Sequence, residues 1–164
     1  MLHVFSNLEG VRIAMEMERR GESFYRRAAK VSRDPETVEM LLHLAADEQN
    51  HREQFERLYQ QARGAGVSSD AYDEETNAYL TAIAADIVFP QGLMGLRSEG
   101  FENPQAVLMH AIRSEKDSIL FYTELAQCTA NAHARDVFLE ITRQERNHMT
   151  WLMRRLEMLK TDMQ

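Results

Sequence analysis

Two Glu-x-x-His motifs are the features of this chain whose residue types and spacing could bind metal ions. A spacing of three residues places a glutamate and a histidine on one face of a helix, about one turn apart. One such motif is expected by chance in so acidic a chain, but here each motif also has a further glutamate 30 residues before its own. The six candidate ligands are Glu18, Glu48, His51, Glu115, Glu145 and His148.

Each of these residues lies on an apolar stripe that repeats at the three- and four-residue spacing of a helix. The polar residues fall near the middle of each stripe, so their side chains are predicted to face the core of a helical bundle. The four stripes are Val11, Ala14, Glu18, Gly21, Tyr25 and Ala28; Leu41, Leu44, Glu48, His51, Phe55 and Leu58; Leu108, Ala111, Glu115, Ser118, Tyr122 and Leu125; and Phe138, Ile141, Glu145, His148 and Leu152.

Four carboxylates buried together need a balancing positive charge, since desolvation and mutual repulsion both oppose their burial. No Lys or Arg lies on the stripes near the acids, which disfavours the alternative of a bundle with buried ion pairs. Two divalent cations would balance the four carboxylates, with two neutral imidazoles as further ligands. Because oxygen ligands dominate, Fe or Mn is favoured over a structural zinc ion. The sequence predicts two Fe ions, with Mn or a mixed pair as alternatives.

The signals for helix ends indicate an all-α chain. Seven glycines and three prolines occur, and they fall between long helical patterns. Ser6 begins a capping box, and the pairs Asp34-Pro35 and Asn103-Pro104 each combine a good cap with the residue preferred at the first helical position. Four long helices are predicted, at about residues 6–31, 35–63, 103–130 and 133–159.

Short loops join the first helix to the second and the third to the fourth, so the helices form two antiparallel hairpins, 6–63 and 103–159. In the connection 64–102, apolar residues at helical spacing predict a short crossing helix over 71–89, and the segment 91–102 is predicted to be a loop. The expected fold is a four-helix bundle made of these hairpins. The long connection lets them pack within one chain or exchange between two chains of a homodimer.

The two hairpins also match each other when the numbering is shifted by 97. The shift was chosen to align the two Glu-x-x-His motifs, so the other matches are the independent ones. We interpret them as an internal duplication. The matched pairs are Ala14 and Ala111, Glu18 and Glu115, Phe24 and Phe121, Tyr25 and Tyr122, Ala29 and Ala126, and Leu42 and Leu139.

Composition narrows the class of protein. The 164 residues, 44% hydrophobic and 27% charged, are typical of one globular domain, expected to span 1–164. The net charge of −7 argues against a nucleic-acid partner, and Cys128, the single cysteine, excludes an iron site made of four thiolates within this sequence. A basic leader and a membrane-spanning apolar run are both lacking, so a cytoplasmic protein without membrane association is expected.

The motifs resemble those of the rubrerythrins and the ferritin-like superfamily of di-iron carboxylate proteins, in particular the small rubrerythrin-like ones. The resemblance covers both hairpins. It implies that Glu48 and Glu145 bridge the two metals and that the other four candidates are terminal ligands. Rubrerythrins carry an additional glutamate one turn after the third-helix ligand, and here that position is Ser118, mirrored by Gly21.

Tyr25 and Tyr122 lie two turns beyond Glu18 and Glu115 on the same stripes. Their hydroxyls either hydrogen-bond a ligand carboxylate or simply belong to the core, and the sequence leaves both interpretations open.

The leading functional hypothesis is an oxidoreductase that reduces hydrogen peroxide or dioxygen at the di-iron site. Full-length rubrerythrins have a C-terminal rubredoxin domain that delivers electrons, and this sequence shows none, so an external electron donor such as a rubredoxin-like protein is expected. The first alternative is an iron-binding or ferroxidase protein that sequesters metal. The second is a bundle in which metals only hold the helices together.

Overall fold

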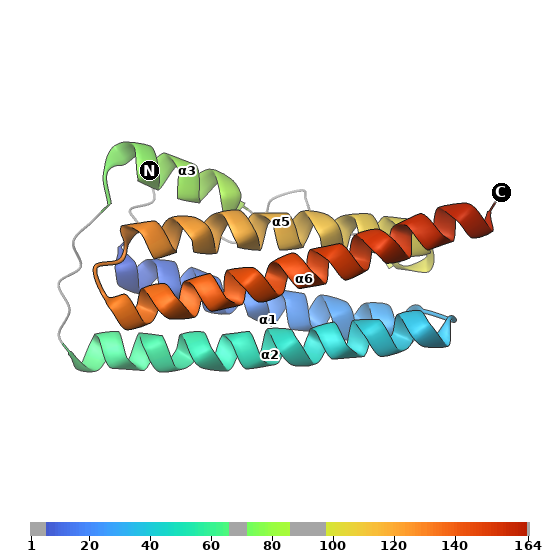
Figure 1. The fold of residues 1–164 in the computed structure, drawn as a ribbon, viewed down its shortest axis with the longest axis horizontal. Helices are drawn as coiled ribbons and strands as arrows, with labels where there is room; N and C mark the ends of the chain where they lie inside the picture. The colour runs from blue at the N-terminus through green and yellow to red at the C-terminus, as the bar shows by residue number, and fades with distance from the viewer. Residues whose placement is uncertain (1–5, 66–71, 86–97, 164) are drawn as a thin grey trace.

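Four long helices form the molecule's main body in the computed structural model, which describes residues 6–65, 72–85 and 98–163. They lie side by side over most of their lengths (Figure 1). The predicted all-α bundle is confirmed. The four helices are α1 (Asn7–Val31), α2 (Pro35–Gly64), α5 (Pro104–Cys128) and α6 (Ala132–Asp162).

The helices begin at side-chain caps. A side-chain oxygen at the cap accepts a hydrogen bond from a backbone N–H of the first turn, which has no partner within the helix. Asp34 accepts from the Thr37 N–H at 2.8 Å, and Asn131 accepts from the Ala134 N–H at 2.9 Å. Ser6 and Asn103 cap α1 and α5 in the same way. These caps fix where each helix starts. The phase of the apolar stripe on each helix then determines which residues face inward.

The helices pair as two antiparallel hairpins, α1 with α2 and α5 with α6. Between the hairpins, α1 contacts α5 and α2 contacts α6. Because α1 and α5 run in opposite directions in Figure 1, as do α2 and α6, the hairpins are related by an approximate two-fold axis across the bundle. This arrangement brings the middle of every helix to the middle of the molecule.

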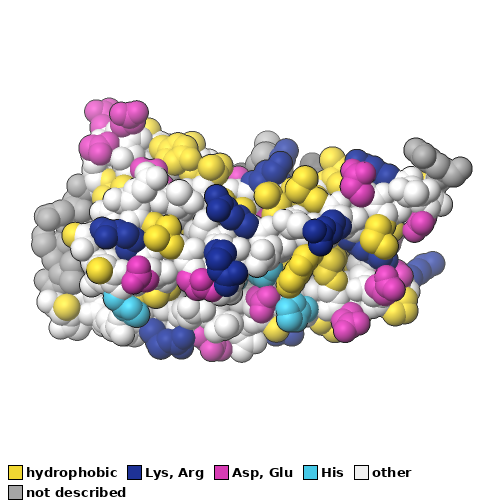
Figure 2. Space-filling view, viewed as in Figure 1, with side chains coloured by type: hydrophobic (Ala, Val, Ile, Leu, Met, Phe, Trp, Pro, Cys, Tyr) yellow, Lys and Arg dark blue, Asp and Glu magenta, His cyan; other side chains and the backbone are white. Residues whose placement is uncertain are grey.

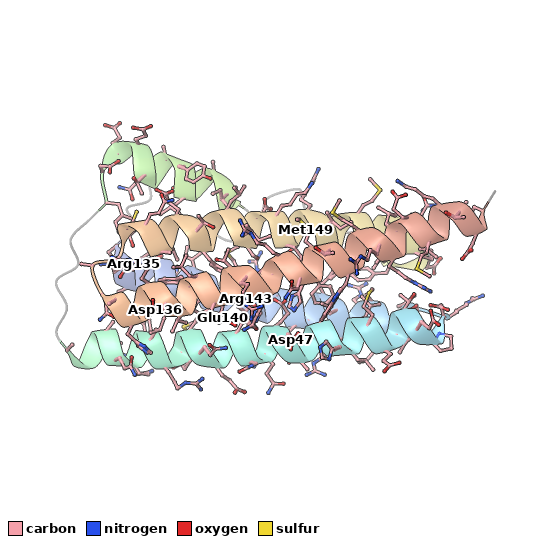
Figure 3. The ribbon with its side chains drawn as sticks, viewed as in Figure 1. Asp47, Arg135, Asp136, Glu140, Arg143 and Met149 are labelled. Atoms are coloured by element: carbon pink, nitrogen blue, oxygen red, sulfur yellow. The ribbon has the colours of Figure 1, made fainter. Side chains whose placement is uncertain are left out.

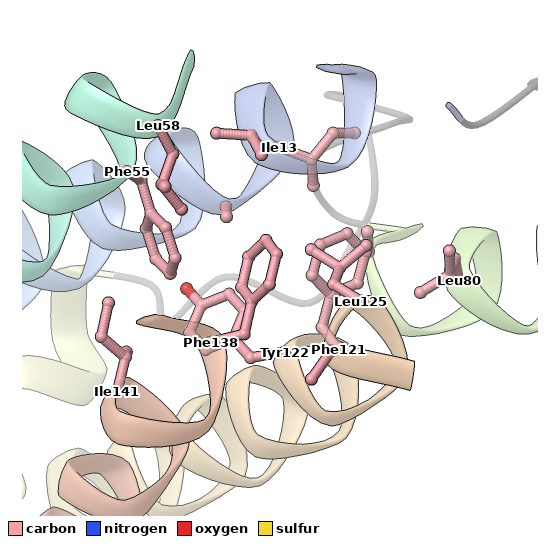
Figure 4. Close-up of a cluster of buried hydrophobic side chains, with 13 residues drawn as sticks. Ile13, Phe55, Leu58, Leu80, Phe121, Tyr122, Leu125, Phe138 and Ile141 are labelled. Carbon is pink, nitrogen blue, oxygen red and sulfur yellow. The ribbon is translucent and has the colours of Figure 1, made fainter. Parts of the chain in front are cut away.

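The apolar core is divided into two clusters. One contains Ile13, Phe55, Phe121 and Phe138 and is shown in Figure 4. The other is built around residues such as Leu41, Leu44, Leu108 and Leu152. Along each long helix, the six candidate ligands fall between residues of one cluster and residues of the other. The polar centre is thus closed at both ends by apolar side chains.

The connection differs in part from its prediction. The short helix α3 spans Glu74–Ile83 and so starts three residues later than predicted, because Asp73 caps it by accepting from the Thr76 N–H at 2.8 Å. Its Leu80 is buried in the first apolar cluster, beside α5. The predicted end of this helix at residues 86–90 lies outside the described residues, as does most of the predicted loop. The last part of that loop, Ser98–Glu102, is a 3-10 helix.

Two helices, α5 and α6, also differ at their ends from the predictions. α5 ends at Cys128, two residues early, because the Thr129 N–H still bonds to Leu125 while Thr129 itself is extended. α6 begins at Ala132, directly after its cap Asn131, and continues to Asp162. Neither difference changes the inward faces.

Charged side chains of both signs are interspersed on the face shown in Figure 2, with exposed apolar side chains between them. Elsewhere in the described structure, some charged residues pair with a neighbour on their own helix, as Arg19 does with Glu16 at 2.7 Å and Arg143 with Glu140 at 2.6 Å. Such exposed pairs contribute little to stability. Within the described ranges, no helix is both long enough and apolar enough to cross a membrane.

Candidate metal centre

The structure brings all six candidate ligands together at the middle of the bundle. α1 and α5 each contribute one glutamate, and α2 and α6 each contribute a glutamate and a histidine one turn further on. None of the six residues is more than 5% exposed. The six residues are Glu18, Glu48, His51, Glu115, Glu145 and His148.

Their ligand atoms form two overlapping groups. In each group, one oxygen or nitrogen from every residue lies within 4.8 Å of those of the other three. Glu48 and Glu145 belong to both groups. Glu18 and His51 complete the first group, and Glu115 and His148 complete the second. Two shared carboxylates between two terminal sets have the form of a centre for two cations.

Both histidines direct the Nδ1 atom into this centre. His51 Nδ1 lies 3.1 Å from a Glu145 oxygen and 3.4 Å from a Glu18 oxygen. His148 Nδ1 lies 2.8 Å from the other Glu145 oxygen and 3.4 Å from a Glu48 oxygen. Each imidazole therefore directs Nδ1 toward the carboxylate oxygens of its own ligand group.

The centre is rich in buried polar atoms that lack a hydrogen bond. Among the described residues, these are Glu18 Oε2, Glu48 Oε1, both Glu145 oxygens and the Nδ1 atoms of His51 and His148. Unpaired buried polar atoms are costly in a folded protein and usually have a specific explanation. Here all six are atoms that ligate divalent metals, so the residues present fit a pair of metal ions.

The outer nitrogen of each histidine is held by a residue that the sequence analysis did not identify. His51 Nε2 bonds to Gln144 Oε1 at 2.8 Å, and His148 Nε2 bonds to Asp47 Oδ2 at 3.0 Å. Each partner comes from the opposite hairpin. A sequence signal existed, because Asp47 and Gln144 each precede the glutamate of a Glu-x-x-His motif and are related by the same shift of 97.

The two tyrosines also reach across the bundle. The Tyr25 hydroxyl of α1 donates a hydrogen bond to Glu115 Oε1 of α5, and the Tyr122 hydroxyl of α5 donates one to Glu18 Oε1 of α1. Burial raises the pKa of both hydroxyls well above the usual value, and nearby carboxylates add to the effect. Both tyrosines therefore remain protonated donors and hold the two outer glutamates in place.

Burial and charge act differently on the acids at the centre. Burial raises the pKa of Glu115 to about 8, with repulsion from Glu145 acting in the same direction. The pKa of Glu48 is raised for the same reasons. Burial would also raise the pKa of Glu145, but its contacts with His148 and His51 lower it well below the usual range.

The histidines carry the compensating charge when no metal is bound. Burial alone would lower the pKa of His51, but its contacts with Glu145 and Glu18 raise that pKa to about 11. The pKa of His148 is also raised, against the effect of burial, with Asp47 as the largest contributor. Protons and metal ions therefore compete for the same inward-facing atoms.

Gly21 provides space for one of the shared carboxylates. A Cβ atom added at Gly21 would lie 2.7 Å from Glu48 Oε2 and 3.2 Å from Glu48 Cδ. Ser118, the related position of the other hairpin, carries a buried side chain instead. The glycine thus leaves room that any larger residue would take from Glu48.

We expect Gly21→Ala to displace the buried Glu48 carboxylate and weaken metal binding about tenfold, since overpacking against a buried side chain typically costs about 1–3 kcal/mol. Anaerobic Co(II) titration measures the change. Gly64→Ala is the matched control, because a Cβ there meets nothing within 4 Å. Equal affinities of Gly21→Ala and Gly64→Ala would show that Glu48 is not confined by this glycine.

Comparisons with known proteins agree with this geometry. A family model for rubrerythrin matches residues 5–90 and 106–164. A crystal structure from Thermotoga maritima, described as that of a ferritin-like diiron-carboxylate protein, matches with a TM-score of 0.75 at 25% sequence identity. That match covers 94% of this chain and 97% of the other. No curated protein matches the sequence significantly.

Proposed function

Because this chain belongs to the rubrerythrin family, we propose that it is an oxidoreductase that reduces hydrogen peroxide or dioxygen at a pair of iron ions. It is a di-metal carboxylate protein, as its family and its buried Glu and His cluster indicate. The observation that carries the proposal is the pair of overlapping ligand groups that share Glu48 and Glu145.

The proposed ligands follow the two groups. Glu18 and His51 would hold one metal, Glu115 and His148 would hold the other, and Glu48 and Glu145 would contribute ligand atoms to both. Four carboxylates balance two divalent cations, which supports this stoichiometry. Each metal receives one nitrogen and several oxygen ligands, a set that suits Fe or Mn and differs from the Cys and His ligands of structural zinc.

When bound, two ferrous ions supply two electrons, the number needed to reduce one hydrogen peroxide to two water molecules. The chain itself excludes bulk water by burying every ligand between two apolar clusters. Tyr25 and Tyr122 orient the terminal glutamates through their hydroxyl protons. Asp47 and Gln144 orient the two imidazoles so that each Nδ1 keeps its lone pair for a metal.

Repeated turnover needs an electron donor, and the residues of this sequence do not form one. Cys128 is its single cysteine, so these residues provide no four-thiolate electron-transfer centre. We propose that a separate small redox protein, such as one with a rubredoxin-like centre, returns two electrons after each reduction.

A second candidate function is the oxidation of ferrous ions for sequestration. It is favoured by Ser118, which occupies the position where the resemblance to rubrerythrins would place an additional glutamate and which is mirrored by Gly21 in the other hairpin. Without that ligand, the centre has fewer oxygen atoms with which to retain iron after oxidation. The two functions differ in whether the iron stays bound and is reduced again.

The test is to load metal-free protein anaerobically with two equivalents of Fe(II) and to add one equivalent of hydrogen peroxide. We expect oxidation of both irons in one step, followed optically, and renewed oxidation on further peroxide when a rubredoxin and its reductase are present. Iron that is oxidised once and is not reduced again by this donor would favour the oxidation of ferrous ions for sequestration. Failure to bind Fe(II) would overturn both functions.

A further inference from the structure

We infer that the two metal positions are not equivalent and that the one completed by His148 binds a divalent cation more tightly than the one completed by His51. The inference rests on the proposed function, because it concerns the same pair of metal ions. It follows from a difference in how the two imidazoles are supported: a carboxylate supports one and a neutral amide supports the other.

The difference stands out because the positions correspond. Asp47 and Gln144 occupy the same place in the two hairpins, related by the shift that superposes the two motifs. Each crosses to the histidine of the other hairpin, at 3.0 Å and 2.8 Å. The inward ligands are the same on both sides, one terminal glutamate and one histidine for each metal position.

The orientation of Gln144 is fixed by its neighbours. Its Nε2 donates a hydrogen bond to Glu140 Oε1 at 2.8 Å, which leaves Oε1 as the atom that faces His51. Glu140 is itself paired with Arg143 through two contacts, at 2.6 Å and 3.0 Å, so its negative charge is compensated. Glu140 and Arg143 lie on the side of α6 that is visible in Figure 3.

The surroundings of Asp47 are different. It lies on α2 where that helix faces α6 (Figure 3), with its side chain 31% exposed. Exposed His43 lies 3.6 Å from the same Asp47 oxygen that accepts from His148. Asp47 forms no ion pair with a Lys or Arg of the described ranges. The carboxylate therefore acts on His148 without a compensating cation like Arg143.

A carboxylate that accepts a hydrogen bond from the outer nitrogen of an imidazole makes the inner nitrogen a stronger donor to a metal. It also adds an anionic charge near the cation. An amide oxygen orients the ring equally well but adds no charge. Changes to such outer partners typically alter metal affinity 10–100-fold, so we expect the two positions to differ about tenfold.

The experiment isolates each position and then exchanges the outer partners. His51→Gln leaves the position at His148, and His148→Gln leaves the position at His51. Co(II) binding to each variant is measured anaerobically over a range of pH, so that the affinities are compared after correction for the protons that Co(II) displaces. We expect the His51→Gln protein to bind Co(II) about tenfold more tightly than the His148→Gln protein.

Isosteric changes then test the cause. Adding Asp47→Asn to His51→Gln should remove the advantage, and adding Gln144→Glu to His148→Gln should confer it. Each change has a matched control in the other background, where its imidazole partner is absent and the affinity should stay within about twofold. Circular dichroism confirms that each variant is folded. A loss that is the same in both backgrounds would assign Asp47 a merely structural role.

Wild-type protein gives an independent measurement should a histidine variant fail to fold. Wild-type protein should bind two Co(II) ions with stepwise binding constants that differ by more than the statistical factor for two equal sites. The difference should be smaller in Asp47→Asn. Two Co(II) ions bound with equal intrinsic affinities would overturn the inference and leave the proposed function intact. A wild-type protein that binds neither Co(II) nor Fe(II) would overturn the proposed function itself.

Discussion

Glu145→Gln should lower the affinity for Fe(II) at both metal positions by more than about 100-fold. This loss exceeds the effect of changing a residue that only hydrogen-bonds a metal ligand. Glu145 belongs to both ligand groups, and its two oxygens face the two histidine Nδ1 atoms at 3.1 Å and 2.8 Å. Removing its charge therefore weakens both positions together. Anaerobic Fe(II) titration measures the number of ions bound and their affinity.

The same change should destabilise the metal-free protein. Breaking a buried ion pair from one side typically costs 3–5 kcal/mol, because the partner's charge stays buried. Chemical denaturation of the metal-free variant measures this loss. Glu157→Gln is the control, since Glu157 lies on the same helix but is exposed, and its one ion pair among the described residues is with Lys160 at 3.8 Å. A Glu145→Gln protein that still holds one metal at wild-type affinity would show that Glu145 is not shared.

Metal-free protein should be less stable at pH 8 than at pH 5.5. The pKa of Glu115 is about 8 in the folded protein against an ordinary value of 4.5, and the pKa of His51 is about 11 against an ordinary value of 6.5. Across this range the native state thus holds more protons than the unfolded chain, so stability falls as the pH rises. Glu145 does not oppose this trend, because its pKa is lowered and it is ionised in both states above pH 5.5.

The expected loss from Glu115 alone is about 3 kcal/mol over this range, at about 1.4 kcal/mol per pH unit. That corresponds to a fall in Tm of roughly 6–12 °C. Thermal melts of chelator-treated protein give the measurement. Glu115→Gln should show a shallower fall, since the amide replaces the protonated acid, whereas Glu157→Gln should keep the wild-type slope.

Metal should reverse the slope. Ligation requires deprotonated carboxylates and a free Nδ1 lone pair, so binding strengthens as the pH rises, and the bound metal stabilises the native state by mass action. A metal-free protein that melts higher at pH 8 than at pH 5.5 would contradict the raised pKa of Glu115 and His51.

The inward faces could be predicted from sequence because each depends only on the phase of one helix. Glu48 and His51 lie on a stripe with Leu44 and Phe55, and a stripe of this length admits a single helical phase. All four stripes are buried as predicted apart from Gly21, which is partly exposed. The caps at Asp34 and Asn103 were equally local signals.

Contacts between hairpins were harder to predict, since they depend on how the helices cross. That Tyr25 bonds to Glu115 rather than to Glu18 of its own helix follows from the antiparallel packing of α1 and α5. Asp47 and Gln144 lie beside the stripes, where a polar residue is usually solvated. The sequence signal that pointed to them was their correspondence under the shift of 97. The early end of the α5 helix depends on a single extended residue, Thr129.

All four hydrogen bonds that support the centre run between hairpins: Tyr25 to Glu115, Tyr122 to Glu18, His51 to Gln144 and His148 to Asp47. A single ancestral hairpin could therefore have closed the same set of bonds only by pairing with a second copy of itself. In such a dimer, every substitution would appear on both sides at once. Fusion of two copies into one polypeptide removes that constraint, so each half can mutate alone while the reciprocal bonds still require both halves to be present.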